Sequence, residues 1–379
     1  KIKKENKILI ITPEQFSFTA EKKLMDAIDT QAVFNAEVVT LSRMAYRVIS
    51  EIGGKNETNL SKCGKAMLIY SILSNNKNEL KFLGKTDENV DMLDTAITEF
   101  KKHGISVEQL KQEIENQEDI YLKNKLQDLN VVYNGFEEQL AGKYIDETDL
   151  LTILAENIDK TDMFKDAVIY IDEFAGFTSQ EYHIIEKLIQ IAKQVTITIC
   201  TDGLHEIKNP DTDIFYSNKL TLYKLINLIQ ENNLKLEEPV QLNKLPRFKN
   251  KELKHLEKNI YNTQSTNYEE NVENIKLFLA KNQYSEVENV AKNITKLVKH
   301  NNLRYKEISV ITKDMNSYSS LIRAIFNKYD IPVFIDEKRD LNQNIIIKYI
   351  LGLLEVISKN FSYDSVISYI KTGFCGIEE

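Results

Sequence analysis

One short stretch constrains the fold more than any other part of the chain. An apolar run from Val168 to Ile171 ends in two adjacent carboxylates, Asp172 and Glu173, and a Thr-Ser-Gln-Glu helix start follows at Thr178. The run is typical of a buried parallel strand, because both faces of such a strand meet core. Carboxylates at its carboxyl end lie where open α/β sheets bind ligands. In nucleotide-hydrolysing motors the first acid holds Mg²⁺ and the second positions water. The plainer alternative is an acidic surface loop.

Length and composition predict a soluble protein of two or three domains, since 42% of the 379 residues are hydrophobic and 28% are charged. No apolar run reaches the roughly 18 residues of a membrane span, and the charged N-terminus leads into an expected strand, so we expect no signal peptide and a cytoplasmic location. Cys63, Cys200 and Cys375 lie far apart and the five histidines are scattered, which predicts no metal cluster. The net charge of −8 argues against a broad basic surface but allows a local basic groove.

Hydrophobic periodicity alternates between two kinds of region. The first and third parts of the chain read strand, helix, strand, which is the rhythm of a parallel α/β sheet, and the part between them is helical throughout. The expected strands are 7–11, 37–41, 168–171 and 195–200, and the expected helices between them are 18–29, a helix from 42, and 179–193. Gly104 and Gly142 close two helices of the middle part, and Thr148 caps a third.

These patterns predict the domain boundaries. A first α/β domain covers 1–60 plus 163–235, and an all-helical insertion of 61–162 interrupts it. A second α/β region, 236–340, is predicted from strands and helices that alternate again, and a further helical segment begins at 341–379 and carries a helix at 341–356. The strands expected in the second region are 275–279, 308–311 and 333–335, and its helices are 217–231 just before it, then 284–299 and 317–328. The chain stops inside an expected domain, so we expect a fragment.

This layout resembles the superfamily 1 helicases of the UvrD type, whose RecA-like parallel-sheet domains of the P-loop NTPase class carry helical insertions. Ile-Asp-Glu-Phe at 171–174, with the helix start after it, resembles the Walker B strand of that family. The segment 308–314 resembles the strand that opens the second motor domain, and 331–336 resembles the passage into the next helical insertion. The resemblance implies the same fold for this chain.

Three further segments narrow the resemblance to the AddB proteins of the AddAB helicase–nucleases. They are Thr-Pro-Glu-Gln-Phe-Ser-Phe at 12–18, Thr-Leu-Ser-Arg-Met-Ala-Tyr-Arg at 40–47 and Leu-Ala-Gly-Lys-Tyr at 140–144. The similarity runs along nearly the whole chain in the expected order. It implies a heterodimer with an AddA-type motor subunit that processes single- and double-stranded DNA ends at double-strand breaks for homologous recombination.

The same resemblance implies what each part of such a complex contributes. The AddB protein recognises the Chi sequence in single-stranded DNA and carries a C-terminal nuclease domain with an iron–sulfur cluster, which would lie beyond Glu379. ATP and Mg²⁺ are implied for the intact complex, which is a hydrolase, and no membrane partner is expected.

Departures from the family pattern concern nucleotide chemistry. No Gly-x-x-x-x-Gly-Lys-Ser/Thr motif occurs in the chain, so the backbone cradle for phosphates is missing; in this family it would precede Lys1. The sequence after strand 195–200 lacks the Gln that senses the γ-phosphate, and Lys313 replaces an Arg, whose two-pronged phosphate contact Lys cannot make. We therefore expect Asp172, Glu173 and Lys313 to form at most a weak or vestigial nucleotide site, with neither ATPase nor nuclease activity in this chain.

DNA contacts are expected on the loops that follow the strands. Gln15 suits paired hydrogen bonds to a base edge, Ser17 a base or phosphate, and Phe16 stacking on an unpaired base. Arg43 and Tyr46 lie three apart at a helix start, hence on one face, and match an arginine and an aromatic that the family uses on Chi. The full set of expected DNA contacts is Gln15, Phe16, Ser17, Arg43, Tyr46, Arg47 for backbone phosphate, and Phe177 for stacking. Phe18 and Met44 are expected in the core.

Three functions remain open at this point. The favoured one is a sequence-reading DNA-binding scaffold with a helicase fold and no motor activity. The second is an active ATP-driven helicase whose phosphate loop lies upstream, and the third is a structural component of a complex that binds no DNA. A complete N-terminus would separate the first two, and binding of single-stranded DNA would separate the first from the third.

Overall fold

The computed structural model describes residues 7–28, 35–53, 58–83, 89–203, 213–242, 248–261, 265–336, 341 and 344–376. The chain divides into two compact units, Lys1–Lys244 and Leu245–Glu379. In the part of the chain described, no helix combines the length and apolar character that crossing a membrane requires.

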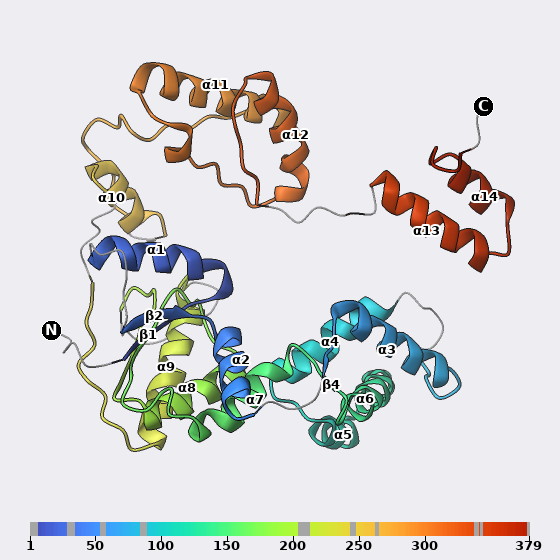
Figure 1. The fold of residues 1–379 in the computed structure, drawn as a ribbon. Helices are drawn as coiled ribbons and strands as arrows, with labels where there is room; N and C mark the ends of the chain where they lie inside the picture. The colour runs from blue at the N-terminus through green and yellow to red at the C-terminus, as the bar shows by residue number, and fades with distance from the viewer. Residues whose placement is uncertain are drawn as a thin grey trace. The chain divides into compact units, whose positions relative to one another are not determined.

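A four-stranded parallel sheet organises the first unit, with the order β2–β1–β5–β6 (Figure 1). Its strands are β1 (Ile8–Ile11), β2 (Ala36–Val39), β5 (Val168–Ile171) and β6 (Gln194–Ile197). Ile8 of β1 lies opposite Ala36 on one side and Val168 on the other. The four strands confirm the α/β expectation, and β5 has the bounds that its apolar run predicts.

Helices cover both faces of this sheet. Parallel crossovers are right-handed, and the chain moves from β1 to β2 in one direction but from β5 to β6 in the other, so the crossover helices α1 and α8 lie on opposite faces (Figure 1). The larger core lies on the face of α8, where α2 and α7 also pack. The helices of this part are α1 (Ser17–Ile28), α2 (Leu41–Glu51), α7 (Asp149–Asn157), α8 (Ser179–Ile191) and α9 (Tyr216–Glu231), with 3₁₀ turns η1 (Glu14–Phe16) and η3 (Ile158–Lys160).

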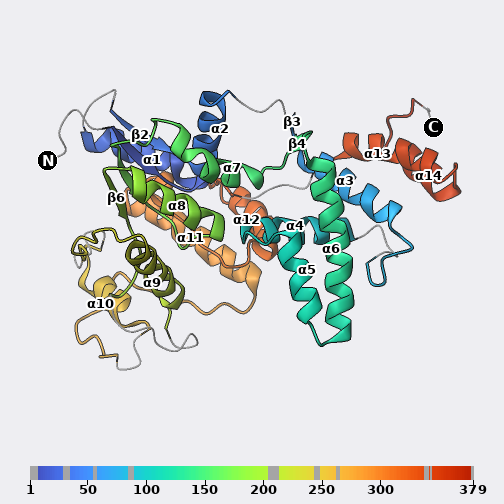
Figure 2. The ribbon, with the colours of Figure 1, turned by 90° about the horizontal axis from the view of Figure 1, so that it is seen from below.

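The middle of the chain forms the expected group of helices with a separate core (Figure 2). It contains α3 (Lys62–Asn75), α4 (Val90–Lys102), α5 (Val107–Asn116) and α6 (Ile120–Leu140). Gly104 and Gly142 follow α4 and α6 with φ of 68° and 69°, the left-handed conformation that ends a helix. Two short strands, β3 (Thr58–Asn59) and β4 (Tyr144–Ile145), pair in parallel where the chain enters and leaves these helices. We call α3 to α6 the helical insertion and the rest of this unit the sheet domain.

The second unit is helical in the residues described. Its elements are α10 (Lys251–Asn259), α11 (Gln283–Asn301), η4 (Tyr305–Glu307), α12 (Met315–Lys328), α13 (Ile345–Ser358) and α14 (Tyr363–Ile370). The expected helices 217–231, 284–299 and 317–328 correspond to α9, α11 and α12. The one expected at 341–356 corresponds to α13, and its residues 342–343 lie outside the described residues. The core of this unit lies between α11 and α12 around Ile294, Ile325 and Phe326.

The strands expected in the second unit are wrong in this structure. Segments 275–279, 308–311 and 333–335 have neither helical nor paired-strand structure. Several of their apolar side chains reach far into solvent, since Leu277 is 100% and Ile311 is 93% exposed, while Ile308 and Ile335 pack partly against the core. A strand requires a neighbour whose backbone groups complete its hydrogen bonds, and apolar composition does not supply one. The domain boundaries 1–60 plus 163–235, 61–162, 236–340 and 341–379 remain predictions.

Candidate nucleic-acid interface

The sheet has a switch point between β1 and β5, because the chain runs from these two strands toward opposite edges. Open α/β sheets bind ligands in the crevice at the carboxyl ends of the strands at such a point. A cavity of about 200 Å³ lies here, and it is lined by residues that follow β1 and β5. They include Phe16, Thr19, Lys23, Leu24, Asp172 and Glu173. The acidic pair therefore lies at the position that the sequence pattern predicts.

Both carboxylates of the pair are engaged by neighbouring donors. The Asp172 amide extends the sheet by donating to the Ile11 carbonyl oxygen at 3.0 Å, and its carboxylate accepts from the Thr198 hydroxyl. Glu173 Oε1 lies 3.3 Å from Lys23 Nζ on α1. Glu173 has φ of 66°, a left-handed conformation that costs a non-glycine residue about 1–2 kcal/mol. Such backbone outliers cluster at functional sites.

The residues present do not fit a magnesium–nucleotide by themselves. Carboxylates are suitable Mg²⁺ ligands, but Glu173 is already paired with the exposed Lys23. No group of three or more His, Cys, Asp or Glu side chains suited to a metal occurs among the described residues, and the sequence has no glycine-rich phosphate loop. The nucleotide role of Asp172 and Glu173 stays a prediction.

The loop after β1 presents two side chains to solvent. Pro13 ends the strand, the turn η1 follows, and Gln15 is exposed on it. Phe16 faces the cavity, and Ser17 is buried, with its hydroxyl donating to the Glu14 carbonyl oxygen at 3.1 Å. Phe18 is 76% exposed, so its expected core position is wrong. At the start of α1 the small Ser17 side chain faces inward, so the side chain of the next residue, Phe18, faces solvent.

The start of α2 presents an arginine and a tyrosine beside this loop. Thr40 caps the helix by accepting from the Arg43 amide at 3.3 Å, and Met44 is fully buried as expected. The Arg43 side chain reaches toward α1, where its Nη1 lies 3.5 Å from Glu21 Oε1, and Tyr46 is 48% exposed. This contact links the first turn of α2 to Glu21 of α1.

Arg47 has a different environment from Arg43. Its two guanidinium nitrogens bind the two oxygens of Glu37 on β2, one of them at 2.7 Å. This hydrogen bonding holds the pKa of Glu37 below its ordinary value and raises the pKa of Arg47. A phosphate would have to displace the Glu37 carboxylate to bind Arg47.

The remaining two candidate residues are Phe177 and Lys313. Phe177 packs in an aromatic cluster, with ring centroids 5.2 Å from Phe174 and 5.6 Å from Tyr182. Burial raises the pKa of the Tyr182 phenol. Lys313 is exposed and belongs to the second unit. The structure thus brings Gln15, Phe16, Ser17, Arg43 and Tyr46 to neighbouring turns, while Arg47 and Phe177 have partners within the protein.

Sequence reasoning missed three charged residues near the sheet's carboxyl edge. Lys23 and Glu21 lie on α1, and the i, i+4 spacing of Thr19 and Lys23 was a signal that both face the crevice. Lys219 on α9 is 4% exposed, and its Nζ lies 2.6 Å from Asp213 and 2.8 Å from Asp202. Burial lowers the pKa of Lys219, but the two carboxylates outweigh that effect and raise it. Nothing in the local sequence marks Lys219 as buried.

Comparison with known proteins places these features in a family. Residues 1–257 match the family model described as ADDB, N-terminal, and residues 242–379 match the UvrD-like helicase C-terminal domain. Relatives named as the B-type subunits of an ATP-dependent helicase/deoxyribonuclease are similar along the whole chain. The one from Clostridium botulinum (strain Loch Maree / Type A3) is 43% identical over 98% of this chain and 33% of the relative. Those of Clostridium tetani and Caldanaerobacter subterraneus are 43% and 42% identical, over 99% and 98% of this chain and 33% and 32% of the relatives.

The chain thus spans about a third of the length of the curated relatives it matches. The match to the N-terminal model covers more than half of the chain, and the helicase-type match to the remainder agrees with the parallel α/β sheet and its helical insertion. On this basis the chain belongs to the AddB family.

Proposed function

We propose that this chain is the helicase-like, DNA-reading part of a cytoplasmic helicase–nuclease that processes double-strand DNA ends for homologous recombination. Its partner is an AddA-type motor subunit. The names of the relatives, which are helicase/deoxyribonuclease subunits, support this proposal. ATP and Mg²⁺ serve the intact complex, and the iron–sulfur cluster belongs to a nuclease domain outside these residues.

The observation that carries the DNA-reading role is the grouping of side chains at the carboxyl edge of the sheet. Gln15, Phe18, Arg43 and Tyr46 are exposed on neighbouring turns. An amide and a guanidinium suit hydrogen bonds to base edges, and exposed rings suit stacking on unpaired bases. With a net charge of −8, binding must depend on such local contacts more than on a broad positive field. We assign Chi recognition in single-stranded DNA to this surface, with the partly buried Phe16 as its wall.

The proposal includes an inactive motor site. Glu173 is paired with Lys23, and Asp172 accepts a hydrogen bond from Thr198, so both carboxylates already have partners within the protein. The alternative of an active helicase is favoured only by the position of the acidic pair at the switch point. A Mg²⁺-dependent ATPase rate in the intact AddB protein that disappears with Glu173→Gln would favour that alternative.

Fluorescence-anisotropy titration tests the proposed reading surface. The intact AddB protein in complex with its partner is titrated at one fixed low salt concentration with a Chi-containing strand and a scrambled strand. A base-edge contact contributes about 1–3 kcal/mol, so Arg43→Ala should weaken Chi binding roughly 5- to 150-fold and the scrambled strand much less. Lys125→Ala removes an exposed cation of the helical insertion and should leave the preference intact. Equal binding of both strands by all three proteins would remove the Chi assignment.

A further inference from the structure

The chain leaves the sheet domain and returns to it at a single crossing. β3 leads into α3, β4 leads out of α6, and the two strands pair beside each other. The pairing is short: the Thr58 amide donates to the Lys143 carbonyl oxygen at 3.1 Å, and the Leu60 amide donates to that of Ile145 at 2.9 Å. Strands of two residues are only marginally stable alone. Without further contacts this crossing would be a hinge.

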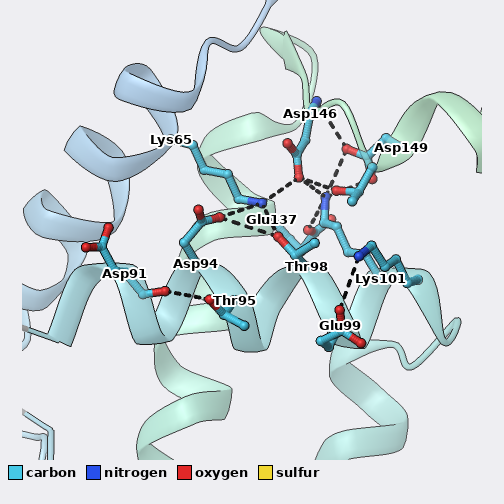
Figure 3. Close-up of polar contacts among 12 residues, drawn as sticks. Lys65, Asp91, Asp94, Thr95, Thr98, Glu99, Lys101, Glu137, Asp146 and Asp149 are labelled. Carbon is cyan, nitrogen blue, oxygen red and sulfur yellow. Dashed lines mark hydrogen bonds and ion pairs between the residues drawn. The ribbon is translucent and has the colours of Figure 1, made fainter. Parts of the chain in front are cut away.

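A buried lysine closes the crossing from the side of α3. Lys65 lies one turn into that helix and is 6% exposed. Its Nζ lies 3.0 Å from Asp146 Oδ2, directly after β4, and 2.9 Å from Asp94 Oδ1 on α4 (Figure 3). It also donates to the Thr98 hydroxyl at 2.8 Å. Lys65 therefore ties the segment that enters the insertion to the segment that leaves it.

A second buried lysine makes a parallel set of contacts. Lys101 of α4 is 7% exposed, and its Nζ lies 2.8 Å from Asp149 Oδ1 and 2.8 Å from Glu137 Oε1 (Figure 3). Burial lowers the pKa of Lys101, but the charges and hydrogen bonds of Asp149 and Glu137 outweigh it and raise the pKa. Both ammonium groups also lie over the Phe136 ring, at 5.5 and 5.3 Å from its centroid. We call Lys65, Lys101, Asp94, Glu137, Asp146 and Asp149 the ionic joint.

The charges of this joint are divided between the two parts that it connects. Both lysines belong to the helical insertion, whereas Asp146 and Asp149 stand at the start of α7. That helix is part of the core of the sheet domain and packs on α2 and α8. Gln180 of α8 continues the connection, since its side-chain amide donates to the Thr148 carbonyl oxygen at 3.0 Å. The Thr148 hydroxyl donates to Asp146 rather than capping α7, so its expected capping role is wrong.

Stability alone does not explain these residue types. Burying lysine and carboxylate removes both from water, and replacing a buried ion pair by well-packed apolar residues is often neutral or stabilising. Apolar surfaces can shift against one another at little cost, whereas an ammonium group within 3 Å of several carboxylates holds the two contacting parts in one relative orientation. The ionic joint lies where the chain crosses between the helical insertion and the sheet domain, so its contacts act on the relative orientation of these two parts.

We propose that the ionic joint fixes the angle between the helical insertion and the sheet domain, and that breaking one lysine–carboxylate link lets the insertion pivot while both parts stay folded. Lys65, Lys101, Asp146 and Asp149 are positioning residues in this arrangement. The inference stands on the contacts at the crossing and does not depend on the proposed DNA function.

Pulsed electron spin resonance on the whole 379-residue chain tests the proposal. One spin label is placed at Glu118→Cys, an exposed position between α5 and α6, and the other at the exposed native Cys200, with Cys63→Ser and Cys375→Ser in the background. Lys101→Met should broaden the distance distribution at least twofold. The matched control is Lys102→Met, the next residue, which is partly exposed and pairs with Glu99 at 3.2 Å within the same helix, α4. An unchanged distribution in Lys101→Met would overturn the proposal.

Hydrogen exchange of the same proteins separates pivoting from unfolding. The proposal predicts faster exchange at the β3–β4 crossing by about tenfold or more, with unchanged protection in β5 and in the centre of α6. If Lys101→Met loses protection everywhere, the milder isosteric Asp149→Asn decides the matter. If Asp149→Asn also loses protection in the cores of both the sheet domain and the helical insertion, the two parts unfold together. That result would overturn the proposal.

Discussion

The buried Lys219 offers a sharp test of how the carboxyl edge of the sheet is held together. Its side chain is 3% exposed and bridges Asp213 at the start of α9, itself 4% exposed, to Asp202 in the loop after β6. The Asp213 carboxylate also accepts from the Phe215 amide at 3.0 Å. Lys219→Met keeps the length of the side chain and removes its charge. The Asp213 carboxylate would then lose this buried ammonium group.

Removing one partner of a buried ion pair costs about 3–5 kcal/mol. For a unit of this size each kcal/mol lowers the melting midpoint by about 2–4 °C, so Lys219→Met should melt roughly 6–20 °C lower. Because the chain has no tryptophan, unfolding in urea is followed by circular dichroism at 222 nm. Lys224→Met is the control, since Lys224 is an exposed residue of the same helix that lies 5.5 Å from the Tyr182 ring centroid, a contact of about 0.5–1 kcal/mol.

The pH dependence of the loss gives a second test of the same reasoning. In Lys219→Met, loss of the Lys219 ammonium should raise the pKa of Asp213 in the folded state. A group with a raised folded pKa loses its contribution to stability as pH rises through that value. The deficit against wild type should therefore be larger at pH 7 than at pH 5. A loss below 1 kcal/mol at pH 7, or an equal loss at both pH values, would refute the account of Lys219.

Three further predictions concern single side chains near the edge. Arg47 lowers the pKa of Glu37 in the folded state, so the stability that Glu37 contributes is present above its unfolded pKa and is lost as pH falls through its folded pKa. Arg47→Ala should therefore raise the Glu37 titration midpoint measured by carbon-detected NMR. An unchanged midpoint would contradict the pairing. Glu173→Gly should relieve the strain of the left-handed backbone and raise the free energy of unfolding by up to about 1 kcal/mol after the entropic cost of glycine. The control Glu173→Gln keeps a side chain and should give no such gain. Equal stabilities of the two variants in urea titration would argue against strain. Met44→Ala should cost about 2–5 kcal/mol of stability. Phe18→Ala should cost little stability but weaken binding of single-stranded DNA roughly 5- to 150-fold, the range expected for a stacked base. The reverse pattern would show that Phe18 is the core residue and Met44 the DNA contact.

Local signals predicted the first unit well. The bounds of β5 follow from an apolar run with a charged end, and Thr178 begins α8 with the reciprocal hydrogen bonds that its Thr-x-x-Glu pattern predicts. Glycines at 104 and 142 mark helix ends because few other residues adopt left-handed backbone readily. These are interactions within one or two turns of chain, so the sequence displays them directly.

Contacts between distant residues were not predictable in the same way. Lys65 pairs with Asp146 across 81 residues, and Lys23 with Glu173 across 150. Lysine and carboxylate are normally surface residues, so the local sequence indicates neither the burial of Lys65 nor the distant partner of Lys23. The second unit shows the opposite error, since the apolar segment around Leu277 reads as a strand but has no paired neighbour in this structure. The predicted core position of Phe18 is wrong because Ser17 takes the buried position at the start of α1 and the side chain after it faces solvent.

Photo-crosslinking of single-stranded DNA tests the central claim most directly. A Chi-containing strand with 5-iodouracil substituted for each thymine in turn is irradiated with the intact AddB protein and its partner, and the crosslinked peptides are identified by mass spectrometry. The account predicts crosslinks at Phe18 or Tyr46, within the turns that begin α1 and α2, and predicts that a scrambled strand gives far fewer of them. Crosslinks confined to the helical insertion, or equal yields from both strands at Phe18 and Tyr46, would contradict a Chi-reading surface at the carboxyl edge of the sheet.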